Sequence, residues 1–98
     1  MKTILDWFAV WKTNRMVGRG VFLLSLGHYD KAMKQILKVI ERDPENHMAW
    51  TAKGLTLAKL GKYKKAIEAY EKALLLNHPV KEREQVMGFL KLARERGQ

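Results

Sequence analysis

Residues 50–74 read WTAKGLTLAKLGKYKKAIEAYEKAL, and their apolar side chains recur every three or four residues on both sides of a turn. The half before the turn carries one apolar stripe, made of Trp50, Gly54, Leu57 and Leu60. The half after the turn carries a second stripe, made of Ala66, Ile67, Tyr70, Ala73 and Leu74. This spacing is typical of amphipathic helices, because a half-buried strand would alternate apolar and polar residues. The stretch therefore predicts two helices joined by a short turn at Gly61-Lys62.

The same pattern occurs earlier in the chain, since Gly20, Gly54 and Gly88 are equally spaced. The shift that carries Gly20 onto Gly54 also superposes further pairs of identical residues: Leu23 and Leu57, Leu26 and Leu60, Gly27 and Gly61, Tyr29 and Tyr63, Lys31 and Lys65, Ala32 and Ala66, and Lys38 and Lys72. A fixed period of this kind indicates one supersecondary unit used again, with neighbouring copies covering each other's apolar faces. We therefore predict an all-α fold.

Turn signals divide the rest of the chain into helical segments. Pro44 and Pro79 each fall near the end of one such segment. The expected helices cover residues 3–12, 14–26, 30–42, 47–60, 63–76 and 80–96. Thr13-Asn14 is a weak break, so the first two segments are expected either as two helices or as one continuous helix.

This pattern resembles the tetratricopeptide repeat family, whose unit of about 34 residues has a Trp-x₂-Leu-Gly-x₂-Tyr run, an alanine with an aromatic residue four positions later, and a closing proline. The second unit matches with Trp50, Gly54, Leu57, Ala66 and Tyr70. The first unit matches more loosely, with Met16, Gly20, Leu23, Ala32, Ile36 and the closing Pro44. Arg19 and Lys53 depart from the pattern, because the family has leucine there. The resemblance implies a right-handed α-solenoid.

The resemblance also divides the single domain into parts. These are an N-terminal amphipathic helix, two helix-turn-helix repeats and a C-terminal capping helix, at residues 1–12, 13–46, 47–80 and 81–98 respectively. In the last part Gly88 keeps the register, but Glu84, Lys91 and Arg94 replace apolar residues of the earlier units. Polar residues at those positions suit a face turned to water, as the terminal unit of a solenoid requires.

Residues 1–12 carry a large apolar area on a short segment. Two repeats fall short of the three or more that such folds usually need, so this area is expected to add to the buried core. It either packs on the first repeat as an N-terminal cap, or joins two copies of the chain, or contacts a partner protein or membrane surface. The candidates for self-association, which would give a homodimer, are Ile4, Trp7, Phe8 and Trp11.

In the family that the chain resembles, the first helices of successive repeats line a concave groove that holds peptides or helices. The positions that would face this groove are Val17, Val21, Leu24, Thr51, Leu55, Ala58, Gln85, Phe89 and Leu92. They are mostly apolar, and exposed apolar surface marks interaction sites. We therefore expect a scaffold or adaptor whose partner is a protein or peptide, docked as an amphipathic helix or as an extended segment, either of which can be acidic. The alternative is a shallow groove that is simply solvated.

The net charge of +9 on 98 residues is high. It fits nucleic acid, an anionic membrane surface or an acidic protein segment as partner, and it also fits a surface that only keeps copies apart. Stacked repeats would gather several cations on a basic edge: Lys59, Lys62, Lys64, Lys65 and Arg94. Nucleic acid and membrane are disfavoured as partners, because no groove-reading helix, basic-aromatic platform or membrane span is recognisable.

Catalysis needs convergent groups, and the sequence offers few. Ser25 is the only serine, and His28, His47 and His78 lack metal-ligand spacing. Cysteine is absent, which excludes disulfides and thiolate metal sites and fits a reducing, cytoplasmic location. The N-terminal stretch does not read as a secretory signal. We therefore predict a non-catalytic protein without a metal or a cofactor.

Overall fold

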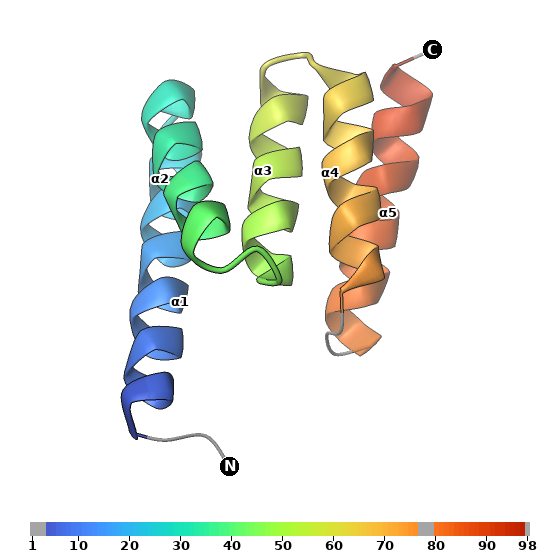
Figure 1. The fold of residues 1–98 in the computed structure, drawn as a ribbon. Coiled ribbons are helices and arrows are strands. Elements are labelled where there is room, and N and C mark those ends of the chain that lie inside the picture. The colour runs from blue at the N-terminus through green and yellow to red at the C-terminus, as the bar shows by residue number, and fades with distance from the viewer. Residues whose placement is uncertain (1–3, 77–79, 98) are drawn as a thin grey trace.

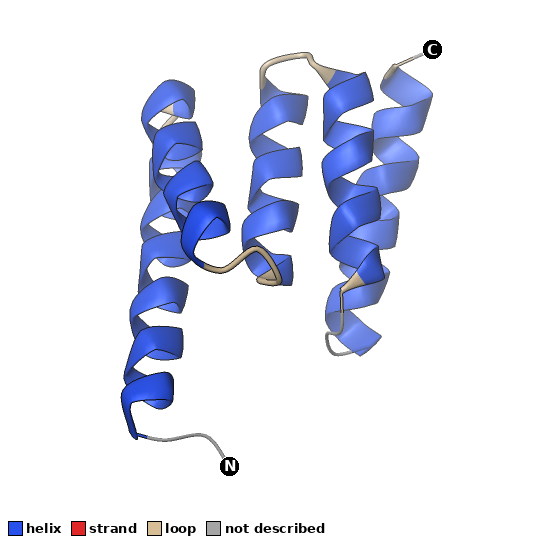
Figure 2. Cartoon of the chain, in the orientation of Figure 1, coloured by secondary structure: helices blue, strands red, loops and turns tan. Residues whose placement is uncertain are grey.

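The computed structural model describes residues 4–76 and 80–97, with side chains from residue 14 onward except at residue 81. The described chain folds into α-helices without any strand (Figures 1 and 2). These are α1 (Ile4–Ser25), α2 (Tyr29–Arg42), α3 (His47–Lys59), α4 (Tyr63–Leu75) and α5 (Val80–Arg96). The prediction of an all-α solenoid of helix-turn-helix units is confirmed.

The predicted helix boundaries differ from the structure mainly at the start. The segments expected at 3–12 and 14–26 form the single helix α1, so the alternative of one continuous helix is the correct one. Neither Thr13 nor Asn14 breaks α1, because both residues can adopt helical backbone angles and no proline or glycine stands beside them.

The helices pack side by side as two antiparallel hairpins followed by α5 (Figure 1). Helix α3 contacts each of the other four helices. Within the described chain, α1 and α2 contact each other and α3, but neither contacts α4 or α5. The first hairpin is therefore joined to the rest only through α3 and the 43–46 connection.

The two hairpin turns have the same geometry because the same glycine recurs. Gly27 and Gly61 have φ of 82° and 79°, a left-handed conformation that favours glycine. The N–H of Gly61 donates to the carbonyl of Ala58 at 3.0 Å, and the next N–H donates to Leu57 at 2.9 Å. The N–H groups of residues 27 and 28 donate in the same pattern to residues 24 and 23. This pair of hydrogen bonds is the Schellman motif, which ends a helix by satisfying its last carbonyls.

Asn46 holds the loop between α2 and α3 and the start of α3 in place. Its Oδ1 accepts a hydrogen bond from the N–H of Ala49 at 3.2 Å, which caps α3. Its Nδ2 lies 3.5 Å from Oδ1 of Asn14 on α1. The indole N–H of Trp50 donates to the carbonyl of Pro44 at 2.7 Å. These bonds orient α3 relative to the first hairpin.

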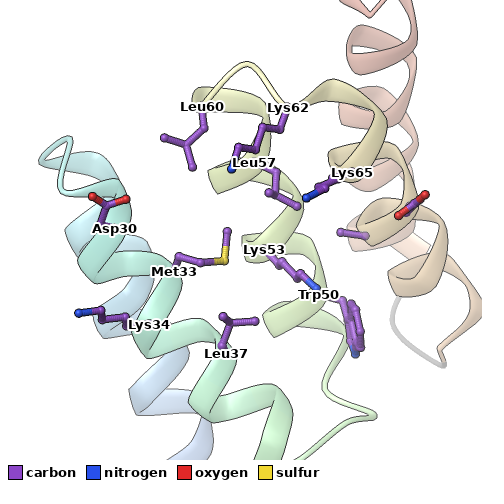
Figure 3. A pocket seen from close by; sticks show the side chains of 12 residues that line it. Asp30, Met33, Lys34, Leu37, Trp50, Lys53, Leu57, Leu60, Lys62 and Lys65 are labelled. Atoms are coloured by element: carbon purple, nitrogen blue, oxygen red, sulfur yellow. The ribbon is translucent and has the colours of Figure 1, made fainter.

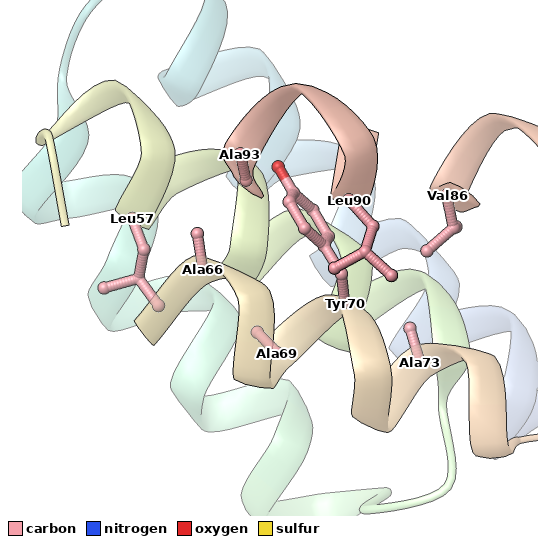
Figure 4. Packing of buried hydrophobic residues seen from close by; sticks show 8 residues of the cluster. All are labelled: Leu57, Ala66, Ala69, Tyr70, Ala73, Val86, Leu90 and Ala93. Atoms are coloured by element: carbon pink, nitrogen blue, oxygen red, sulfur yellow. The ribbon is translucent and has the colours of Figure 1, made fainter. Parts of the chain in front are cut away.

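The largest buried cluster lies between α3, α4 and α5 and centres on Tyr70, which is 1% exposed (Figure 4). Its other members are Leu57, Ala66, Ala69, Ala73, Val86, Leu90 and Ala93. Two smaller clusters join α1, α2 and α3. One contains Val17, Val39 and Ala49, and the other contains Ala32, Ile36 and Ala52. The many alanines allow the helix backbones to lie close together.

The repeated glycines allow the closest of these approaches. A Cβ added to Gly20 would lie 2.8 Å from Cγ1 of Ile36, and one added to Gly54 would lie 2.5 Å from Cδ1 of Tyr70. Each glycine thus receives a large side chain from the second helix of its own repeat. A Cβ on Gly88 would meet nothing within 4 Å, although Gly88 holds the same repeat position.

Replacing Gly54 by alanine is therefore expected to destabilise the protein, while Gly88→Ala stabilises it. The Gly54→Ala methyl group must displace the buried Tyr70 ring, which costs about 1–3 kcal/mol and outweighs a gain of about 1 kcal/mol in helix propensity. In Gly88→Ala the added methyl group meets no neighbour, so only the gain in helix propensity remains. The free energy of unfolding from urea titrations followed by circular dichroism tests both variants. A shift of the same sign in both would contradict the close-approach explanation.

Candidate partner-binding site

A hollow of about 260 Å³ lies between α3 and α5, against α4. It brings together Leu55, Ala58, Phe89 and Leu92, four of the residues that the sequence places in the groove. The rest of its lining consists of Lys59, Tyr63, Tyr70, Ala93 and Arg96. We call this hollow the α3–α5 pocket.

The wall of the α3–α5 pocket is apolar and its rim is basic. The rings of Tyr70 and Phe89 lie 6.0 Å apart at a tilt of 32°, a favourable aromatic arrangement. Leu92 is 51% exposed, and the exposed side chains of Lys59 and Arg96 also line the pocket. Such a site can accept an apolar side chain and attract a carboxylate beside it.

The remaining predicted groove residues lie outside this pocket. On α1, Val21 is exposed, whereas Leu24 is half-buried against the core of the first repeat. The Thr51 hydroxyl donates to the carbonyl of His47 at 3.0 Å, and Gln85 is exposed on α5. Of the predicted groove, the structure thus brings four residues of α3 and α5 into one hollow and leaves Thr51 and Gln85 outside it.

Val17 does not face an open groove. It is 1% exposed and packs with Val39 and Ala49. The prediction that Val17 is accessible in the groove is wrong, because α1 turns this residue toward α2 and α3.

The proposed self-association residues lie on the part of α1 whose side chains are outside the described residues. The helical backbone of α1 includes Ile4, Trp7, Phe8 and Trp11, and their role stays a prediction. Further along α1, Phe22 is exposed, as is Leu26 just after the helix, and sequence reasoning did not single out either as a binding residue.

The α3–α4 turn and the C-terminal end of α5, which carry the residues of the predicted basic edge, lie at the same end of the molecule (Figure 1), but these residues do not share one hollow. Lys59 borders the α3–α5 pocket, whereas Lys62 and Lys65 line a different hollow. Arg94 pairs with Glu71 at 3.3 Å, with both side chains about half exposed. Lys64 is exposed and lines neither hollow.

That second hollow, of about 740 Å³, lies between α2 and α4 and is floored by α3 (Figure 3). Sequence reasoning missed it as a site. Trp50, Leu57 and Leu60 belong to the apolar stripe that the sequence predicts, whereas Met33 and Leu37 of α2 lie neither on a predicted stripe nor in the predicted groove. Only the spacing of Met33 and Leu37, one turn apart on α2, could have pointed to it.

The described residues hold no group of three or more histidine, cysteine or acidic side chains able to bind a metal ion. One His–Glu contact joins two helix starts, since Nε2 of His47 lies 3.4 Å from Oε2 of Glu82. In the described part of the chain, every helix is too short or too polar to cross a membrane.

Paired antiparallel helices, with the same turn and the same glycine contact recurring from one hairpin to the next, define a helical repeat protein of the solenoid class. Two family models described as tetratricopeptide repeat match the chain, one over residues 16–46 and the other over residues 47–78. The chain belongs to the tetratricopeptide repeat family, which is generally a non-catalytic module for protein–protein interaction. No curated protein is similar enough in sequence to count as a relative.

The buried Tyr70 phenol predicts a loss of stability at high pH. Burial raises the pKa of Tyr70 to about 12, above the ordinary value of about 10. Below pH 10 the phenol is neutral in the folded and in the unfolded state, so its full contribution to the free energy of unfolding is present. Between these two values only the unfolded state ionises, and the free energy of unfolding falls. Urea titrations over this range are expected to show a smaller fall for Tyr70→Phe than for wild type. Equal falls would contradict the prediction.

Proposed function

We propose that the chain is a non-catalytic adaptor that holds a helix or an extended segment of a partner protein along its concave side. The α3–α5 pocket is the observation that carries this proposal, because it joins Leu55, Ala58, Phe89 and Leu92 in one apolar hollow. Family membership supports an interaction scaffold in general.

The size of the pocket favours an anchoring side chain over a cofactor. Small-molecule sites usually have about 300–1,000 Å³, and the pocket has about 260 Å³. An aliphatic or aromatic side chain of the partner would bury the exposed part of Leu92, and Lys59 and Arg96 favour an acidic residue next to that anchor. We propose no cofactor and no reaction, and a cytoplasmic location in keeping with the absence of cysteine.

Charge placed in the pocket is expected to abolish this binding. Peptides selected from a displayed random library on the wild-type protein should carry an aliphatic or aromatic anchor. Leu92→Glu is expected to raise the dissociation constant of these peptides at least about tenfold, because it puts a carboxylate where the anchor must be desolvated. Fluorescence anisotropy of labelled peptides gives the dissociation constants.

Leu75→Glu is the matched control, because Leu75 is a largely exposed leucine on α4 that lines neither hollow. Circular dichroism should show the same helicity for both variants. Selected peptides that bind Leu92→Glu as tightly as wild type would refute the pocket as the site.

A second candidate is a homo-oligomeric module assembled through the N-terminal part of α1. Phe22 near the end of α1 and Leu26 just after it are exposed apolar residues, and they favour this alternative. Light scattering over a concentration series is expected to give a dimer mass for wild type and a monomer mass for a Trp7→Ser, Phe8→Ser, Trp11→Ser variant. A wild-type mass that stays monomeric at every concentration would exclude this candidate.

A third candidate is a basic module on nucleic acid or an anionic surface, which the net charge of +9 favours. Binding of this kind falls steeply with salt, because each phosphate contact releases counterions. Adaptor binding through the apolar α3–α5 pocket is expected to depend much less on salt.

A further inference from the structure

The hollow between α2 and α4, here called the α2–α4 groove, lies on the side of α3 away from the α3–α5 pocket. The backbones of α2 and α4 do not approach each other closely, so α3 forms the floor between them. Successive helix residues are about 100° apart, which places Leu55 about 140° around α3 from Trp50 and leaves Leu57 near Trp50. The two hollows therefore use different faces of α3.

The floor of the α2–α4 groove is mostly apolar, and Lys53 is its one charged residue. Trp50, Leu57 and Leu60 follow one side of α3, and this stretch of helix spans about 15 Å, or about three turns. Met33 and Leu37 form a parallel row on α2 (Figure 3). Leu37 is 44% exposed and Leu60 is 39% exposed, so part of this apolar surface meets solvent. The α2 row is shorter, about one turn or about 6 Å, and it widens the apolar strip on α3. A strip of this shape fits the face of an amphipathic helix.

The walls of the groove carry an excess of positive charge. Lys34, Lys53, Lys62 and Lys65 line it, against Asp30 and Glu68. The ion pairs that join two described residues are those of Glu82 and Glu71, and neither involves a lysine of the groove. The Lys53 ammonium instead lies 5.0 Å from the centre of the Trp50 ring. Cations beside an apolar floor act more strongly on a partner's charge than they would in bulk water.

We propose that the α2–α4 groove binds an acidic amphipathic helix of a partner protein. The helix would be about three turns long, with apolar residues at i, i+4 and i+7 on the floor and glutamate or aspartate facing the lysine walls. A second copy of the chain is a poor occupant, because the chain carries a charge of +9 and would repel the groove. Nucleic acid is a poor occupant as well, because the floor offers leucine and methionine and only one aromatic ring for base stacking.

This inference is independent of the proposed adaptor site. Because the two hollows lie on different faces of α3, one molecule can hold a partner in each. The protein would then join an acidic helix on one side to an apolar anchor on the other.

The test uses a synthetic helical peptide of about 14 residues, with leucine at i, i+4, i+7 and i+11 and glutamate at most other positions. A second peptide replaces glutamate by glutamine. The reporter protein is the full chain with Trp7→Phe and Trp11→Phe, which leaves Trp50 as its only tryptophan. We expect the acidic peptide to change Trp50 emission and the glutamine peptide to bind at least about tenfold more weakly.

Paired charge reversals locate the binding. The variant with Lys34→Glu and Lys65→Glu changes two groove lysines, and its affinity for the acidic peptide is expected to fall at least about tenfold. Lys38→Glu with Lys64→Glu makes the same change in net charge at exposed positions of the same two helices outside the groove. That control variant is expected to bind within about threefold of wild type. Lys38 and Lys64 are exposed and each lies about 100° around its helix from the neighbouring groove residue, so solvent and salt screen their charge from a bound peptide.

Four results would overturn the inference. The acidic peptide fails to bind the wild-type chain at millimolar concentration, or both charge-reversed variants lose affinity equally. Alternatively, Leu92→Glu abolishes binding of the acidic peptide while the groove variant retains it, which would assign the acidic helix to the α3–α5 pocket. Finally, a single-stranded oligonucleotide binds the protein more tightly than the peptide does, and its binding is lost in the variant with Lys34→Glu and Lys65→Glu. Because Leu92→Glu tests the adaptor site separately, failure of the groove is distinguishable from failure of the proposed function.

Discussion

The contact of the Tyr70 ring with the backbone of Gly54 determines how closely α3 and α4 approach. The ring fills the space that a side chain on Gly54 would need, and it packs in one cluster with Val86, Leu90 and Ala93 of α5. Ile36 plays the same part against Gly20 in the first hairpin with an aliphatic side chain. Close packing of small against large residues at the same repeat position helps a chain this short to bury its apolar clusters. Where this arrangement ends, at Gly88, the helix surface is open.

Helix α3 serves both hollows because it is the central element of the fold. One of its faces supplies Leu55 and Ala58 to the α3–α5 pocket, and another supplies Trp50 and Leu57 to the α2–α4 groove. The bonds of Asn46 and Trp50 orient it at its N-terminal end, and the Schellman turn at Gly61 ends it. Each binding surface is thus built on a helix held at both ends, which reduces the loss of conformational freedom when a partner binds.

The equal spacing of Gly20, Gly54 and Gly88 was sufficient, with the turn residues, to predict the helices and the family, because glycine, proline and apolar spacing act locally. The α3–α5 pocket was also largely predictable, since its four apolar groove residues follow from helix geometry. Val17 was placed wrongly, because its burial depends on how far α1 rotates toward α2 and α3. The α2–α4 groove was missed for a similar reason. Its existence depends on the separation of α2 from α4, a long-range distance that neither helix encodes in its own pattern.

The joining of the first hairpin to the rest through α3 has a consequence for local unfolding. In the described chain the backbones of α1 and α2 approach neither α4 nor α5, and Met33 of α2 packs at the edge of the Tyr70 cluster. The hairpin can therefore detach while the buried members of that cluster stay together. In repeat proteins of this kind, stability is a sum over units and their shared interfaces. Amide protons of the first hairpin would then exchange through a partial opening, and those around Tyr70 only through a larger one. Opening of the hairpin would remove the α2 wall of the groove and leave the α3–α5 pocket in place, so a ligand of the groove would also clamp the two halves of the molecule together.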